Sequence, residues 1–172
     1  MFSFVGTRSV FGAGADVTAL QKAAGQGDAA AQLQLGQSYY IGRGVEKDVV
    51  KAAQWFQKAA AQGHREAQYY LGTMYRAGQG VEKDAAKATL WYQKAADQGH
   101  VAAQFNVGTA YRFGWGVPKD EAKVAEWYQK AADQGHAKAQ EELKKMGSKS
   151  STAERPATQS PQKGGPVVSK SR

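Results

Sequence analysis

The three histidines of the chain are the residue type that most often binds metal ions or exchanges protons near neutral pH, and they recur at a fixed spacing. His64, His100 and His136 stand 36 residues apart, and each follows a glycine. Zinc requires nitrogen ligands at roughly 2.0–2.1 Å. Histidines at equivalent positions of successive repeats lie about one repeat apart, too far to share an ion. We therefore expect them to begin helices rather than to form a metal site.

Three glycine-flanked triplets have some similarity to phosphate-binding loops. They read Gly-Arg-Gly at 42–44, Gly-Gln-Gly at 78–80 and Gly-Trp-Gly at 114–116. A phosphate-binding loop follows a strand and ends in Gly-Lys-Ser or Gly-Lys-Thr, and the sequence has neither at these places. No set of serine, cysteine, histidine and aspartate suited to catalysis occurs outside the repeated positions. The sequence therefore predicts turns here, and a protein that is not an enzyme and has no metal, cofactor or small-molecule substrate.

The unit that must position these residues is a repeat of about 36 residues. The stretch WYQKAADQGH at 91–100 returns unchanged at 127–136 and with small changes at 55–64. A fixed period of this length is typical of repeat arrays, whose stacked units bury a shared core. We place the three repeats at about 28–63, 64–99 and 100–135.

Each repeat is predicted to hold two helices joined by a glycine-rich turn. In the second repeat, residues 65–77 carry apolar or small side chains at helical spacing. Gly78 suits the end of this helix because glycine tolerates positive φ. Asp84 suits the start of the next helix, which runs to about residue 98, because its carboxylate can accept free backbone N–H groups.

The full pattern is A-Q-x-x-L-G-x-x-Y-x-x-G-x-G-V-x-K-D-x-x-K-A-x-x-W-Y-Q-K-A-A-x-Q-G. It resembles the Sel1-like repeat (SLR), a relative of the tetratricopeptide repeat, over roughly residues 17–146. Departures are mild, with Val124 in place of the usual alanine and Val107 in place of leucine. The resemblance implies an all-α fold, a right-handed α-solenoid of antiparallel helix pairs in three 36-residue repeats. It also implies a scaffold or adaptor that binds a partner protein or peptide.

Fixed positions within the repeat suggest how its helices pack. Glycine in mid-helix costs about 1 kcal/mol relative to alanine, so its return in every copy predicts the close approach of an aromatic ring; these glycines are Gly36, Gly72 and Gly108. The buried stripe of the second helix predicts that Trp55, Trp91 and Trp127 fill the core. Four recurring glutamines are predicted either to hydrogen-bond along the stack or simply to be solvated; they are Gln32, Gln68, Gln104 and Gln140.

The segments outside the repeats differ in character. Half-repeats at 17–27 and 136–146 are predicted to cap the array, with residues 1–16 as a flexible leader and 147–172 as a disordered basic tail. Ala13-Gly14-Ala15 resembles a signal-peptidase site, but no basic region precedes it. A cytoplasmic location is therefore favoured, with export as the alternative if the true start lies upstream. No stretch approaches the roughly 18 apolar residues of a membrane span.

The charge of the chain is unevenly placed. The formal net charge is +8, and the tail after Met146 holds five Lys or Arg residues and one Glu. The repeats lack the aromatic and basic platform that single-stranded nucleic acids need. Binding of nucleic acid or an acidic surface through the tail is therefore the alternative function, and a monomeric protein-binding scaffold is the favoured one.

The face of each first helix that turns away from the core stripe varies between copies. By its resemblance to tetratricopeptide arrays, this face lines a concave groove that binds a partner. The predicted partner-binding residues are Leu33, Gln37, Tyr40, Tyr69, Thr73, Arg76, Phe105, Thr109, Arg112, Phe113 and Trp115. The apolar row would hold an extended peptide, and the two arginines would favour an acidic one. Two alternatives stay open: these long side chains simply cover the surface, and Trp115 shields the C-terminal cap.

Overall fold

The computed structural model describes residues 17–153. The predicted leader at 1–16 and the tail from 154 onward lie outside the described residues. The described part of the chain folds into helices and contains no β-strand. The helices are α1 (Val17–Gly25), α2 (Ala29–Ile41), α3 (Val49–Ala61), α4 (Arg65–Ala77), α5 (Ala85–Asp97), α6 (Val101–Phe113), α7 (Glu121–Asp133) and α8 (Ala137–Ala153).

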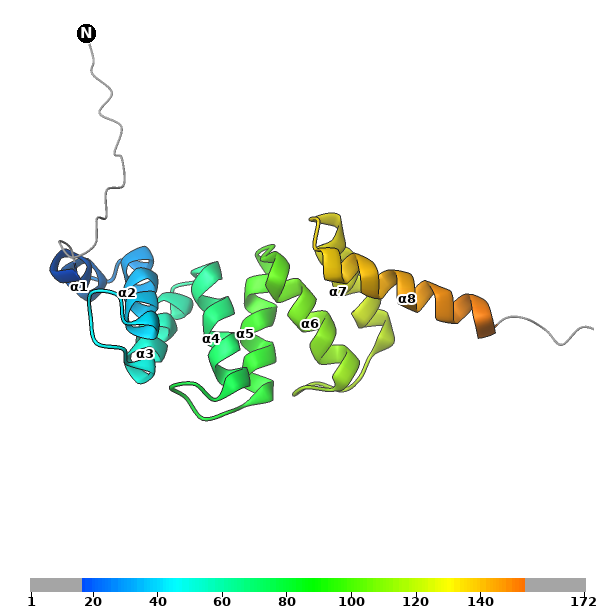
Figure 1. Cartoon of the computed structure of the whole chain (residues 1–172), viewed down its shortest axis with the longest axis horizontal. Helices are drawn as coiled ribbons and strands as arrows, with labels where there is room; N and C mark the ends of the chain where they lie inside the picture. The colour runs from blue at the N-terminus through cyan, green and yellow to red at the C-terminus, as the bar shows by residue number, and fades with distance from the viewer. Residues whose placement is uncertain (1–16, 154–172) are drawn as a thin grey trace, which may run out of the picture.

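The helices form a single elongated row, with α1 at one end and α8 at the other (Figure 1). Each helix packs mainly against the helices that precede and follow it in the sequence. Such an arrangement makes each repeat depend on its neighbours rather than on one central core. The prediction of an all-α solenoid built from helix pairs is confirmed.

The two helices of each repeat begin and end where local sequence signals predict. Gly78 ends α4 in the left-handed conformation, with φ of +70°. Asp84 precedes α5, and its carboxylate accepts the backbone N–H of Lys87 at 2.9 Å. The same caps recur one repeat earlier at Gly42 and Asp48. Because these signals lie within a few residues of each helix end, they fix the helix boundaries before any packing is considered.

An aromatic ring of the second helix packs against a glycine of the first helix in every repeat. A Cβ at this glycine would lie only 2.6–2.8 Å from the nearest ring carbon, at Gly36 from Phe56, at Gly72 from Tyr92 and at Gly108 from Tyr128. A methyl group does not fit at that distance, so glycine lets the two helices come this close. The predicted approach of an aromatic ring to the mid-helix glycine is confirmed.

The prediction that tryptophan fills the core is wrong for two of the three copies. Trp55 and Trp91 are only partly buried, whereas Trp127 is buried. The next residue along the helix, about 100° further round its axis, takes the inward position against the glycine. The indole instead lies at the boundary with the preceding repeat, where Trp91 packs against the buried cluster of α3 and α4. The ammonium group of Lys94 also lies over the Trp91 ring, 4.2 Å from the ring centroid.

Three of the recurring glutamines each form one side-chain hydrogen bond to the preceding repeat or half-repeat and one within their own repeat. The side-chain amide of Gln68 donates to the carbonyl of Ala60 at 3.2 Å, and its oxygen accepts the amide of Gln98 at 2.8 Å. The same pair of bonds joins Gln32 to Ala24 and Gln62, and Gln104 to Ala96 and Gln134. These three glutamines are buried, so the bonds satisfy polar groups that water cannot reach. The hydrogen-bonding alternative is confirmed at these positions.

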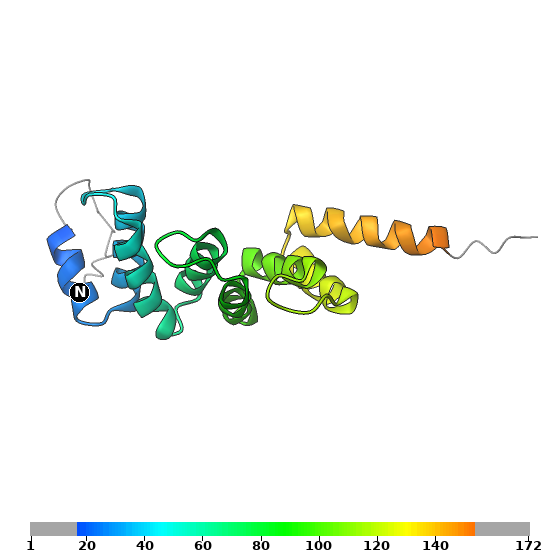
Figure 2. The same ribbon diagram turned by 90° about the horizontal axis from the view of Figure 1, so that it is seen from below.

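One helix precedes the three helix pairs and one follows them, α1 and α8, and α8 extends beyond the rest of the array (Figure 2). Leu143 and Met146 of α8 pack against the buried cluster of α7. The helix then continues to Ala153, so the predicted boundary at Met146 is corrected. No proline occurs between Ala137, where α8 begins, and Pro156, and a proline disfavours helical backbone at the residue before it. The sequence therefore contains no strong helix-breaking signal until that point.

Candidate partner-binding surface

A pocket of about 300 Å³ lies between the second and third repeats. The end of α4, the loop before α5, the first part of α5, the middle of α6 and the loop after α6 form its wall. The lining residues are Arg76, Lys83, Ala85, Ala88, Thr89, Tyr92, Asn106, Ala110 and Trp115. Of the predicted partner-binding residues, the pocket brings together Arg76 and Trp115, which come from different repeats.

The sequence analysis did not predict the other seven lining residues, which include Lys83 and Asn106. Asn106 carried a usable signal, because its repeat-equivalents are Tyr70 and Glu142 and the position therefore differs in every copy. Lys83 carried none, since a lysine stands at the same place in all three repeats.

The loop that carries Trp115 is fixed by its contacts with α5. The carbonyl oxygen of Trp115 accepts the hydroxyl of Thr89 in α5 at 2.7 Å. Gly116 follows with φ of +68°, and a Cβ there would lie 2.3 Å from the Cα of Ala86. The loop is therefore seated directly on the first turn of α5. The Trp115 side chain is 39% exposed and stacks on Phe113 with centroids 5.3 Å apart.

The two arginines of the predicted groove have different surroundings. Arg112 pairs with Glu142 of α8, and both side chains are largely covered, at 30% and 21% exposure. Arg76 is exposed and forms no ion pair with any described residue. The sequence predicted that both arginines would bind an acidic partner. In the structure Arg112 is paired within the chain, whereas Arg76 is open to solvent.

The predicted apolar row is half-buried. Leu33, Tyr69 and Phe105 each pack against the buried cluster that involves the following repeat. Tyr69 stacks on His100 with ring centroids 4.4 Å apart, and Phe105 stacks on His136 at 4.6 Å. Burial raises the pKa of the Tyr69 hydroxyl. The row therefore contributes to the contact between repeats and offers a partner only part of its surface.

The other predicted residues on the first helices are also partly buried or hydrogen-bonded within the chain. The hydroxyl of Thr73 accepts a hydrogen bond from Tyr92 at 3.2 Å, and Thr109 is bonded to Tyr128 at the same distance. Tyr40 donates to the side-chain oxygen of Gln79 at 3.0 Å, across the first boundary between repeats. Gln37 is half-buried on α2.

All three histidines precede the first residue of a helix, as the sequence predicts. His100 accepts the backbone N–H of Ala103 through Nδ1 at 3.2 Å, and its Nε2 lies 3.1 Å from Glu66. His136 caps α8 in the same way through Ala139. Within residues 17–153, the structure contains no group of three or more histidine, aspartate or glutamate side chains arranged to hold a metal ion.

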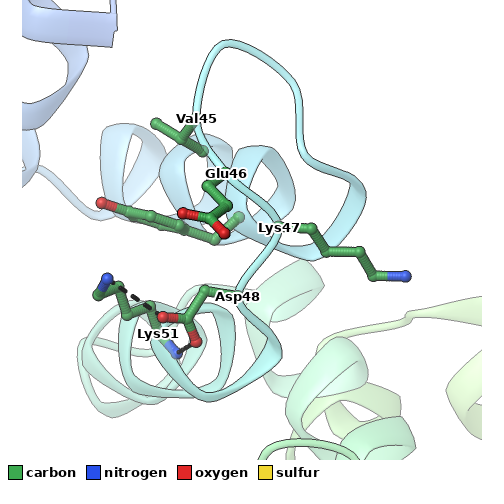
Figure 3. A pocket seen from close by; sticks show the side chains of 6 residues that line it. Val45, Glu46, Lys47, Asp48 and Lys51 are labelled. Atoms are coloured by element: carbon green, nitrogen blue, oxygen red, sulfur yellow. Dashed lines mark hydrogen bonds and ion pairs between the residues drawn. The ribbon is translucent and has the colours of Figure 1, made fainter.

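A second hollow, of about 410 Å³, lies in the first repeat beside the loop after α2. Two of its four charged side chains form an ion pair, in which the ammonium of Lys51 lies 3.1 Å from the carboxylate of Asp48. Lys47 points away from this pair (Figure 3). The backbone N–H of Lys51 lowers the pKa of Asp48 most strongly. The carboxylate serves as the cap of α3, so this hollow has a structural role.

The repeat detected in the sequence matches a known family model. The model of the Sel1 repeat matches three successive segments, at residues 29–64, 65–100 and 101–136. The chain belongs to the Sel1-repeat family. The matched segments begin one residue after the predicted repeats, because the prediction counted the capping residue before each first helix as part of the repeat. Proteins of the Sel1 family are in general protein-interaction scaffolds.

Solved structures of other Sel1-repeat proteins share the fold. The crystal structure of c5321, a protective antigen of uropathogenic Escherichia coli with an SLR fold, is 42% identical over 73% of this chain, with a TM-score of 0.71. This chain covers 27% of the c5321 chain. A Sel1 repeat protein from Oxalobacter formigenes is 42% identical over 76% of this chain and 98% of its own, also with a TM-score of 0.71. The cysteine-rich protein B of Helicobacter pylori is 25% identical over 74% of this chain and 97% of its own, with a TM-score of 0.56. No curated protein matches the chain.

No helix in the described part of this Sel1 array has the length and apolar character needed to cross a membrane.

The ion pair that joins the last Sel1 repeat to α8 makes the stability of the chain depend on pH. The guanidinium of Arg112, with a further contribution from Lys145, holds the pKa of Glu142 below its ordinary value of 4.5. A carboxylate with a lowered pKa stabilises the folded state above its unfolded pKa, and this contribution is lost as the pH falls through its folded pKa. For this partly exposed pair we expect a contribution of about 0.5–1 kcal/mol to the free energy of unfolding.

Glu142→Gln should therefore lower the free energy of unfolding near pH 6.5 and make little difference near pH 3. Urea denaturation of both proteins at the two pH values measures this. An equal loss at both pH values would contradict the ion pair and indicate a packing effect of the substitution.

Proposed function

We propose that this chain is a non-enzymatic scaffold or adaptor that binds a partner protein or peptide at the surface between its second and third Sel1 repeats. The general role of Sel1-repeat proteins as interaction scaffolds supports the proposal. The observation that carries it is the position of Trp115, a partly exposed tryptophan at the edge of a pocket. The equivalent residues of the other repeats are Arg43 and Gln79.

The chemistry of this surface is typical of protein interfaces. Tryptophan and arginine are the residues most enriched at binding hot spots, and here Trp115 and Arg76 line one pocket. Phe113, which is 53% exposed, stacks on Trp115 and enlarges the aromatic area. The half-buried residues of the first helices, such as Tyr69 and Phe105, would extend the contact along the array. A partner that lies across α4 and α6 would thus meet an aromatic anchor and a cation together.

A photo-crosslinking experiment tests the location of this surface. A photoreactive phenylalanine analogue placed at Asn106, inside the pocket, is expected to capture a specific partner in cells that produce the protein. The same analogue at Gln57, an exposed position of α3, is the control and should capture none of it. Capture of the same proteins from both positions, or from Gln57 alone, would contradict the proposed surface.

The captured partner then gives a second readout. Trp115→Ala should weaken its affinity by about 2 kcal/mol, or roughly thirtyfold. The melting temperature should change little, because the bond from Thr89 reaches the backbone of Trp115 and not its side chain.

The alternative function, binding of nucleic acid or an acidic surface through the basic tail, concerns residues that lie mostly outside the described part of the chain. That alternative and the monomeric state stay predictions.

A further inference from the structure

The last turn of each first helix presents one polar side chain to the following repeat. The three equivalent residues are Tyr40, Arg76 and Arg112, which stand 36 residues apart. Tyr40 donates its hydroxyl to Gln79 of the next repeat. Arg112 pairs with Glu142 of α8, which is the first-helix half of an incomplete repeat. Two of the three positions therefore have a polar partner within the chain.

The Arg112–Glu142 ion pair shows that an arginine at this position can bind a carboxylate on the next first helix. Glu142 lies on α8 at the place that Asn106 occupies on α6, one repeat earlier. The guanidinium and the carboxylate meet across the boundary between two first helices, and both are partly shielded from water. The backbone arrangement is thus suited to an arginine–carboxylate contact, which is among the stronger polar interactions in proteins.

The equivalent site one repeat earlier has the cation but not the acid. Arg76 and Asn106 line the same pocket, and Asn106 offers a neutral amide where Glu142 offers a carboxylate. Lys83 adds a second positive charge to the wall, and no acidic side chain lines the pocket. Neither Arg76 nor Lys83 forms an ion pair with a residue that the structure describes. Two unneutralised cations therefore face a space of about 300 Å³.

We infer that this pocket is a carboxylate-binding site, in which an aspartate or glutamate of a partner protein takes the place that Glu142 takes at Arg112. The inference rests on the proposed function and names the partner chemistry that the surface selects. Arg76 and Lys83 bind the carboxylate, and Trp115 packs against the residue beside it. The partner is thus an acidic segment with an apolar side chain next to the acid.

The chain itself supplies the first test, because Asn106→Glu rebuilds the missing acid. The introduced carboxylate should pair with Arg76, so NMR titration should find its pKa below that of an ordinary glutamate. Adding Arg76→Gln should return that pKa toward its ordinary value, while adding Lys94→Gln, on the far side of α5, should not. A carboxylate that titrates normally, or one that is insensitive to Arg76→Gln, would overturn the inference.

The second test uses a display library of random linear peptides against the full chain. Peptides selected at this surface should be enriched in Asp or Glu, and changing that acid to its amide should weaken binding by about tenfold or more. Arg76→Gln and Asn106→Glu should each cause a similar loss, whereas Asn106→Gln should not. Peptides that depend on Trp115 but show no preference for an acid would overturn the inference and leave the proposed function standing. Peptides that bind equally to wild type and Trp115→Ala would overturn both.

Discussion

Tyr92→Ala is expected to lower the free energy of unfolding by about 3–5 kcal/mol, the usual cost of removing a large aromatic ring from a packed core. Tyr92 is only 2% exposed. Its ring lies against Gly72, and its hydroxyl donates to Thr73. The substitution therefore removes the ring that holds α5 against α4 in the middle of the array. Urea denaturation followed by circular dichroism measures the loss.

A double-mutant cycle with Gly72 separates the ring contact from other effects. Gly72→Ala alone should destabilise the chain by about 1–3 kcal/mol, because the new Cβ would lie 2.8 Å from the Tyr92 ring. In the Tyr92→Ala background the ring is gone, and the higher helix propensity of alanine is worth about 1 kcal/mol. Gly72→Ala should then cost much less than in the wild type, because only the carbonyl oxygen of Ala88, at 3.1 Å, still lies close to the new Cβ. An equal cost in both backgrounds would show that the glycine is not required by the ring.

Gly116→Ala should be the most damaging change in the loop that carries Trp115, at about 2–5 kcal/mol. The residue has φ of +68°, a conformation that side chains other than hydrogen disfavour. The new Cβ would also lie 2.3 Å from the Cα of Ala86, a backbone atom that cannot rotate away. The loop must then lift from α5, which loosens the contact between the second and third repeats.

Gly99→Ala is the matched control for this prediction. Gly99 also has positive φ, at +81°, but nothing lies within 4 Å of the Cβ that alanine would add. It should therefore show only the conformational cost, about 1–2 kcal/mol. If Gly116→Ala and Gly99→Ala lower the free energy of unfolding equally, the loop is not pressed against α5 as the structure shows.

Much of the fold was predictable because its signals are local and repeated. Asp84 and Gly78 mark helix ends through bonds and backbone angles that involve only nearby residues. The mid-helix glycines indicated the close approach of a neighbouring helix in each repeat, because glycine is costly there. The period of 36 residues then fixed the number of helix pairs without any knowledge of the packing.

Features that depend on contact between repeats were harder to predict. Trp91 and Tyr92 are adjacent aromatic residues on the same side of a helix, and a helical wheel does not show which of them meets Gly72. To predict the pairing of Arg112 with Glu142, one must know that α8 packs next to α7 and places Glu142 beside the end of α6. The pocket around Arg76 was only partly predicted, because Lys83 reaches it from a loop whose sequence is the same in every repeat.

The indole N–H resonances of the four tryptophans can show directly whether a partner binds at the surface between the second and third repeats. These signals are to be followed by NMR while the partner captured at Asn106 is added. We expect a large change for Trp115 and small changes for the other three tryptophans, which lie on the second helices; these are Trp55, Trp91 and Trp127. An unchanged Trp115 signal in the saturated complex, or larger changes at the other three, would contradict the proposal.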